Sequence, residues 1–220
     1  MLLPLFPLPG VVHFPGTRLP LHVFEPRYRQ LLEDLLERPA AERRIGMILV
    51  APGPAGSRRE LLEPGCAGLL VEHRPLDDGR SDIVLRGEFR FRVEREIEGR
   101  AYRQAEVEPL EERVGLIDDE LARSLQREIV ELAVAVAVRA GERSPIDLSD
   151  LAGLEGEGRL PVLVNRIAAR LDVPPLRRQS LLALEPLDRG RELAGILRSR
   201  VKLYDTLAPY RHLAERPALN

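Results

Sequence analysis

The chain has almost no lysine. Lys202 is the single lysine among 33 basic residues, and the rest are arginines. A P-loop needs a lysine after a glycine-rich turn to reach nucleotide phosphates, and no such turn precedes Lys202. Ser199 and Lys202 have the spacing of a Ser–Lys pair, but they lie in a stretch of helical apolar periodicity without the companion motifs of that chemistry. We interpret the pair as a coincidence of spacing.

Cysteine and long apolar runs are equally scarce. Cys66 is the only cysteine, which excludes an internal disulfide and is typical of a reducing compartment. The best apolar run, residues 129–138, is interrupted by Glu131 and is too short to cross a bilayer. The apolar N-terminus lacks a basic region and contains three prolines, which favours a strand over a signal peptide. We predict a cytoplasmic protein that does not bind a membrane.

An excess of charge of one sign is also missing. The formal net charge is −2, so composition gives no reason to expect binding to nucleic acid or an anionic membrane. No histidine belongs to an i,i+4 pair or a zinc motif; the four are His13, His22, His73 and His212. Cys66 leads into an apolar strand, where a thiol is an ordinary core residue rather than a nucleophile for His73. We therefore expect no catalytic residue, metal or cofactor; an enzyme of unrecognised type would need a pocket of perturbed titratable groups.

Residues 1–112 have a mostly extended pattern. Six prolines within the first 26 residues prevent a helix and favour short strands broken by turns. One helix is predicted over about residues 25–37, and buried strands are predicted over 45–51 and 67–72. The apolar face of that helix consists of Tyr28, Leu31, Leu32, Leu35 and Leu36. This half therefore predicts a small, strongly bent antiparallel sheet or pseudo-barrel with one helix.

The clearest strand covers residues 82–94. Its apolar residues share one face at period two, and they are Ile83, Leu85, Phe89, Phe91 and Val93. Gly87 interrupts the alternation and predicts a bulge or a close backbone approach. The other face carries Arg86, Arg90 and Arg92, followed by Arg95, interleaved with Glu88, Glu94 and Glu96. We interpret these charges as cross-strand pairs on a solvated face, with a local RNA-binding patch as the alternative.

From about residue 116 the apolar spacing becomes helical. A first helix ends before Gly141, a second covers about 160–171, and a short third follows Pro174 and Pro175. The last helix begins at Glu185–Pro186 and ends near residue 207. The glycines of residues 153–158 have the wrong order for a dinucleotide loop and are interpreted as a connection. The fold class is therefore α+β: a β-rich domain over 1–112, a helical bundle over 113–212 and a tail over 213–220.

Several blocks of sequence carry a family resemblance. They are LPLFPLPGVVHFPGTRLPLHVFEPRYRQLLEDLL, RRIGMILV, VLRGEFRFRVE and, in the helical half, LVNRIAARLDVPPLRRQSLLALEP. In order and spacing, over about residues 2–210, the chain resembles the N-terminal substrate-binding domain of the ATP-dependent protease Lon. The ATPase and Ser–Lys peptidase modules of Lon are not in this sequence, so the chain resembles a stand-alone form of that domain.

The resemblance implies a PUA-like β subdomain followed by a helical bundle. It also implies non-catalytic binding of polypeptide substrates or another protein, including exposed apolar segments of damaged proteins. Glu25, Arg27 and Tyr28 match the FEPRY block, and we expect them to fix the junction between sheet and helix, because buried charges need partners. An RNA-binding PUA-like module is the alternative function.

The opening of the chain holds a surplus of apolar side chains. Ten of them lie within residues 5–24, more than a small sheet buries on one side. We expect the helical half to cover most of them and a remaining patch near the sheet–helix junction to contact polypeptide. The candidate contacts are Phe14, Phe24 and Tyr28.

Overall fold

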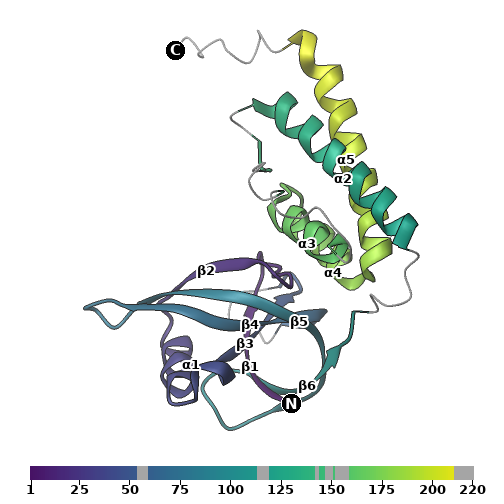
Figure 1. The fold of residues 1–220 in the computed structure, drawn as a ribbon. Coiled ribbons are helices and arrows are strands. Elements are labelled where there is room, and N and C mark those ends of the chain that lie inside the picture. The colour runs from purple at the N-terminus through teal and green to yellow at the C-terminus, as the bar shows by residue number, and fades with distance from the viewer. Residues whose placement is uncertain (54–58, 113–118, 142–143, 147–150, 152–158, 211–220) are drawn as a thin grey trace, which may run out of the picture. The chain divides into compact units, whose positions relative to one another are not determined.

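The computed structural model describes residues 1–53, 59–112, 119–141, 144–146, 151 and 159–210. The strands are β1 (Leu2–Leu8), β2 (Arg18–Val23), β3 (Arg44–Val50), β4 (Leu61–Pro75), β5 (Ser81–Ile97) and β6 (Gln104–Leu110) (Figure 1). The helices are α1 (Pro26–Leu36), α2 (Asp119–Ala140), α3 (Leu160–Arg170), α4 (Pro175–Ala183) and α5 (Pro186–Leu207), with 3₁₀ turns η1 (Ala40–Glu42) and η5 (Ala208–Tyr210). The predicted α+β class is confirmed.

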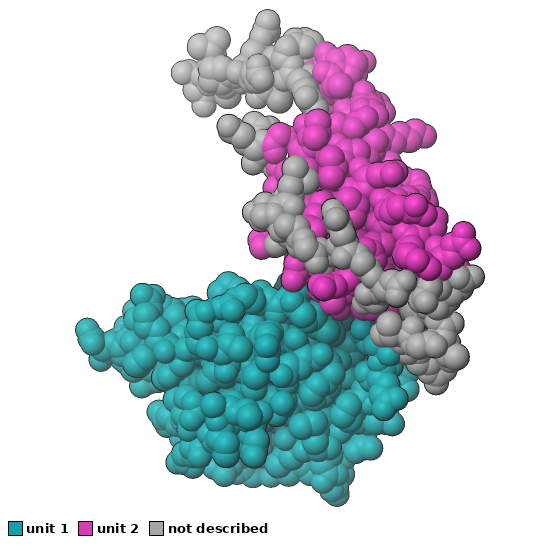
Figure 2. Space-filling view, viewed as in Figure 1, with its two compact units in different colours: residues 1–112, 173–184 teal, residues 113–172, 185–220 magenta. Residues whose placement is uncertain are grey.

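The chain divides into two compact units (Figure 2). Unit 1 consists of residues 1–112 together with 173–184, and unit 2 consists of residues 113–172 and 185–220. Helix α4 therefore belongs to the β-rich unit, although it follows the predicted boundary at residue 112. The tail proposed for residues 213–220 lies outside the described residues.

All six strands of unit 1 form one sheet in the order β2-β5-β4-β3-β1-β6, and an additional β5–β6 pairing closes five of them into a pseudo-barrel. The sheet is mixed rather than antiparallel as predicted, because β1 and β3 run parallel with Leu5 opposite Gly46. A parallel pair requires a crossover connection, and β2 and α1 provide it. Strand β2 pairs only with the first half of β5, outside the closed part.

Gly87 produces both of the features predicted for it. The β4–β5 register shifts between Ala67–Phe89 and Gly68–Gly87, which is a bulge beside the glycine. The Gly87 N–H donates to Thr17 O (2.9 Å), and Gly87 O accepts from Gly16 N–H (2.9 Å). A Cβ on Gly87 would lie 2.2 Å from Phe14 O, so only glycine lets the two backbone segments approach this closely.

Helix α1 packs its predicted apolar face on the sheet (Figure 1). Pro26 occupies its first turn, and Leu31, Leu32 and Leu35 lie in a core with residues of β1, β2, β3, β4 and β5. A second core fills the pseudo-barrel and contains Leu5, Ile48, Ala67, Phe91 and Val107. Two cores on opposite sides of the strands explain why β3 is buried along nearly its whole length.

Arg90 corrects one prediction from the sequence. The strand pattern predicts that Arg90 lies on a solvated face, but its side chain is only 1% exposed. Its Nη1 donates to Leu182 O and Leu184 O at the end of α4, each at 3.0 Å, and its Nε lies 3.4 Å from Glu112 Oε1. The carbonyls at a helix C-terminus have no partner within the helix, and the guanidinium supplies one. Arg90 thereby ties α4 to the sheet.

Gln179 provides a second tie between α4 and the sheet. Its side-chain amide donates to Leu62 O and Pro64 O in β4, each at 2.9 Å. In the first tie the buried Arg90 guanidinium of β5 donates to carbonyls at the end of α4, and in the second a side chain of α4 donates to carbonyls of β4. Polar bonds therefore hold α4 to the sheet in addition to apolar packing. These bonds are the physical reason that residues 173–184 belong to unit 1.

Unit 2 is built from α2, α3 and α5. Its core contains Ile129 of α2, Leu163 and Val164 of α3, and Leu193 and Leu197 of α5, at the helical spacing predicted. The fully buried Arg189 donates to Asn165 Oδ1 inside the unit. The predicted connection over residues 153–158 lies outside the described residues. In the part of the chain that the structure describes, no helix is long and apolar enough to span a membrane.

Candidate functional site

A groove of about 680 Å³ lies at one end of the pseudo-barrel in unit 1. Its walls come from the ends of β1, β3 and β5, the start of α1, and the turn between β5 and β6. Because β1 and β3 are parallel, both of their carboxyl ends reach this edge. We call it the barrel-end groove; it lies where the sequence predicted the sheet–helix junction.

Aromatic rings form part of the groove wall. Tyr28 stacks on Phe6 with the ring centroids 3.8 Å apart and an interplanar angle of 14°. The Arg27 guanidinium lies 4.6 Å from the Tyr28 ring centroid and pairs with Glu25 at 2.7 Å. Burial raises the pKa of the Tyr28 phenol, so the ring stays neutral at physiological pH. Glu25, Arg27 and Tyr28 lie at the start of α1, where the FEPRY block falls in the chain.

A hydrogen-bonded network holds the β5–β6 turn against α1. Tyr102 donates to Asp34 Oδ2 at 2.6 Å, and Arg100 lies 3.1 Å from the same carboxylate. The hydrogen bond from Tyr102 holds the pKa of Asp34 below its ordinary value, while burial and that same bond raise the pKa of Tyr102 to about 12. The turn is therefore fixed by groups that keep their protonation states across the physiological range.

The rest of the groove is strongly charged. Arg103 forms a fork with Glu96 (Nη2–Oε1 2.6 Å and Nε–Oε2 2.7 Å), and its Nη1 donates to Arg59 O at 2.9 Å. Four arginines and three glutamates line the groove; they are Arg27, Arg59, Arg100, Arg103, Glu25, Glu96 and Glu98. A site with apolar rings and paired charges of both signs suits a polypeptide better than a polyanion.

A second hollow, of about 690 Å³, lies over β2, β4 and β5. His22 Nδ1 lies 2.7 Å from Asp82 Oδ1, and Arg74 pairs with the other carboxylate oxygen. The hydrogen bond with His22, followed by that from Arg74, lowers the pKa of Asp82. His73 is bonded to Ser81 instead (3.2 Å), so these groups do not form a Ser–His–Asp relay.

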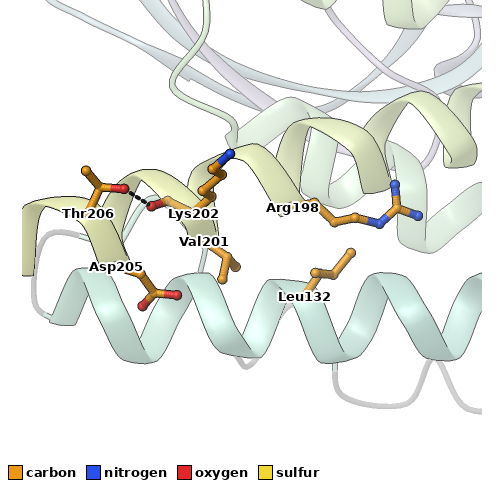
Figure 3. Close-up of a pocket in the computed structure, with 6 residues that line it drawn as sticks. All are labelled: Leu132, Arg198, Val201, Lys202, Asp205 and Thr206. Atoms are coloured by element: carbon orange, nitrogen blue, oxygen red, sulfur yellow. Dashed lines mark hydrogen bonds between the residues drawn. The ribbon is translucent and has the colours of Figure 1, made fainter.

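The third hollow lies in unit 2, between α2 and α5, and includes Lys202 (Figure 3). Leu132 of α2 and Val201 and Asp205 of α5 point into the space between the helices, whereas the Lys202 side chain extends away from α2 (Figure 3). Ser199 Oγ donates to Gly195 O of its own helix at 3.0 Å. Ser199 does not line this hollow, and its hydroxyl is bonded to its own helix, as expected if the Ser–Lys spacing is a coincidence.

The predicted contact residues have three different environments. Phe14 is fully buried beneath the Gly87 crossing, Phe24 is 58% exposed just before α1, and Tyr28 lines the barrel-end groove with only 3% of its surface exposed. Phe24 adjoins Glu25, which also lines the groove. Glu25 and Tyr28 both line the groove, and Phe24 is the residue before Glu25 in the sequence. Phe14 lies in the core instead. Sequence reasoning missed Arg59, Arg100, Arg103 and Tyr102, because residues outside helices and strands carry no periodic signal.

Cys66 and His73 are well separated. Cys66 is completely buried and its Sγ donates to Ala67 O at 3.7 Å. His73 lies seven residues further along the same strand, a separation of roughly 23 Å at about 3.3 Å per residue. The two side chains therefore cannot act as nucleophile and base. Within the described residues, no group of three or more histidine, cysteine or acidic residues is placed to hold a metal ion.

Comparison with known proteins places this architecture in a family. The family model of the ATP-dependent protease La (Lon) substrate-binding domain matches residues 2–199. The chain belongs to this family. It is 28% identical over 198 residues to a Lon protease of Roseiflexus castenholzii and 27% identical over 210 residues to one of Anaeromyxobacter dehalogenans. These matches cover 89% and 87% of this chain but only 23% of each relative, so the chain spans about a quarter of the length of these Lon proteases.

Solved structures of Lon N-terminal domains have the same fold. The N-terminal domain of the Mycobacterium avium complex Lon protease matches with a TM-score of 0.68 and 16% identity, covering 90% of this chain and 98% of that one. A Lon N-terminal domain protein from Xanthomonas campestris matches with a TM-score of 0.57 and 26% identity, covering 89% and 98%. The resemblance inferred from the sequence is confirmed, and the matched family model is that of the substrate-binding domain.

Proposed function

We propose that this Lon-type substrate-binding domain is a non-catalytic module that binds unfolded or apolar polypeptide segments at the barrel-end groove. The observation that carries the proposal is this groove, with its aromatic wall and paired charges, in a chain of the substrate-binding family. Its volume of about 680 Å³ is in the range of specific ligand sites and accommodates a few side chains of an extended peptide. We propose cytoplasmic polypeptides as its partners.

The three candidate residues have different proposed roles. Phe24 is the contact residue, because its ring packs beside His22 (centroids 6.1 Å apart) and yet the residue is 58% exposed, which leaves surface for an apolar side chain of the ligand. Tyr28 forms a rigid part of the groove wall, because its ring is stacked on Phe6 and the residue lines the groove. Phe14 supports binding from the core by anchoring the segment that crosses Gly87.

RNA binding is the weaker alternative. The comparisons give it no support. Arg95 and Glu106 pair across β5 and β6 (3.0 Å), and Arg44 pairs with Glu88 (2.6 Å), as expected of a solvated face with cross-strand charge pairs. An RNA-binding surface needs arginines that are not already neutralised by neighbouring carboxylates.

The test uses a permanently unfolded model protein and a folded globular protein of similar size as ligands, with affinity measured by fluorescence anisotropy. We expect the chain to bind the unfolded ligand and to discriminate against the folded one. Phe24→Ala should weaken binding about five- to tenfold, because an exposed aromatic contact residue is lost. Leu203→Ala is the matched control, since Leu203 is 54% exposed in unit 2 and should leave the affinity unchanged. Equal, weak binding of both ligands by the wild type would count against the proposed function.

A further inference from the structure

We propose that the barrel-end groove recognises a carboxylate group carried by an apolar polypeptide and that Arg59 binds this carboxylate. The inference rests on the proposed function and specifies its ligand. It follows from the partners of the groove's arginines, from the way Arg59 is held, and from the apolar residues that share the groove.

Arg59 differs from the other arginines of the groove in its partners. Three of its four arginines have acidic partners: Arg27 pairs with Glu25, Arg100 with Asp34, and Arg103 with Glu96. For Arg59, no carboxylate partner is found among the described residues. The third glutamate of the groove, Glu98, balances the formal charge, so the position of Arg59 supports the inference and an excess of positive charge does not. A guanidinium without a carboxylate partner can bind one carboxylate of a ligand through two parallel hydrogen bonds.

The backbone of Arg59 is fixed although its side chain is available. Arg103 Nη1 donates to Arg59 O at 2.9 Å, and the next residue is bonded to the end of β3 through Ala51 N–H and Glu60 O at 2.9 Å. The fork of Arg103 is itself held by both oxygens of Glu96. A guanidinium that extends from an anchored backbone loses less freedom on binding than one on an unsupported segment.

Apolar residues share the groove with Arg59 and the other charged side chains. Leu8 and Val50 end the parallel strands β1 and β3, and Ile97 ends β5; all three are buried or half-buried and line the groove. Apolar side chains of a ligand would cover these residues and exclude water from the Arg59–carboxylate contact. A charge pair in such a site is worth more than one in open solvent, where the gain is small.

The ligand test uses three labelled peptides with one apolar core sequence, measured by fluorescence anisotropy on the intact chain. The first has a free C-terminal carboxylate and no acidic side chain, the second is amidated with one internal glutamate, and the third is amidated with glutamine at that position. We expect about tenfold tighter binding of a carboxylate peptide than of the third, with the preference decreasing at high salt. A preference for the first alone identifies a chain terminus as the source, and a preference for both identifies any carboxylate.

The protein test compares Arg59→Gln with Arg86→Gln. Arg86 is 55% exposed on β5 and does not line the groove, so it controls for the loss of one positive charge. Arg59→Gln should abolish the preference for carboxylate while the glutamine peptide binds as before, and Arg59→Lys should restore part of it as a point charge. Arg86→Gln should retain the preference in full.

The outcomes separate the two proposals. Equal affinity of the wild type for all three peptides overturns the carboxylate inference and leaves polypeptide binding intact. A preference that survives Arg59→Gln, or that Arg86→Gln removes equally, also overturns it. Failure of every peptide and of the unfolded protein to bind overturns the proposed function itself.

Discussion

At the scale of single residues, the burial of His13 makes the free energy of unfolding depend on pH. Its ring is 3% exposed, and within the described structure its Nε2 has no hydrogen-bond partner. Gly68 and Gly87 make room for the ring, since a Cβ on either would lie 3.3 Å or 3.1 Å from Nε2. Burial lowers the pKa of His13 from 6.5 to about 4, so the folded protein keeps the ring neutral.

This burial predicts a loss of stability in mild acid. Between pH 6.5 and 4 the unfolded chain binds a proton at His13 that the folded chain does not, so the free energy of unfolding falls as the pH falls. We expect a loss of about 2–3 kcal/mol between pH 7.5 and 4.5 from this residue, measured by urea unfolding. His13→Gln should be less stable at neutral pH but show a flatter dependence. An identical pH dependence in the variant and the wild type would contradict this account.

At the scale of elements, two glycines of α5 respond in opposite ways to the same substitution. A Cβ at Gly190 would lie 2.9 Å from Leu125 Cδ2, where α2 packs on α5, whereas a Cβ at Gly195 has no atom within 4 Å. Gly195→Ala should stabilise the helix by about 0.5–1 kcal/mol, because alanine restricts the unfolded chain and favours helix. Gly190→Ala should destabilise by about 1 kcal/mol, because Leu125 must move. Thermal unfolding of the two variants measures both, and equal shifts would show that α2 does not pack on α5 at Gly190.

The elements were predictable where their signal is local. The leucines of α1 and the alternation of Ile83, Leu85 and Phe91 follow helical and strand periods, and the structure confirms both. The burial of Arg90 was not predictable, because its partners are carbonyls more than ninety residues further along the chain. A sequence pattern cannot show which charged residue of a strand meets the end of a distant helix.

The candidate site was predictable only in part. The FEPRY block located the start of α1, and Tyr28 lines the groove there. Phe14 and Phe24 have the same chemistry, yet one is buried and the other is 58% exposed, because the loop crossing at Gly87 covers only the first. Arg27 lies in α1, but Arg59, Arg100 and Arg103 lie outside the helices and strands, where no period distinguishes a ligand contact from a solvated charge.

At the scale of the whole molecule, unit 1 is completed by a segment from late in the sequence. Arg90→Leu should remove the bonds to the end of α4 and leave those carbonyls and Glu112 without this partner. We expect a loss of about 3–5 kcal/mol in the free energy of unfolding of unit 1 and much faster hydrogen exchange over residues 175–183. Arg92→Leu, on the same strand but exposed, should change stability by less than about 0.5 kcal/mol. Unchanged exchange in α4 of the Arg90 variant would show that its apolar packing alone holds the helix.

The discontinuity of unit 1 also has a consequence for the order in which a ribosome produces the protein. The six strands are synthesised first, but α4 follows only after the 113–172 stretch has been translated. At about 5–20 residues per second, this delay amounts to roughly 3–12 s, far longer than a helix or hairpin takes to form. During that interval the Leu182 and Leu184 carbonyls that accept from Arg90 have not yet been synthesised, so the nascent sheet lacks this tie to α4.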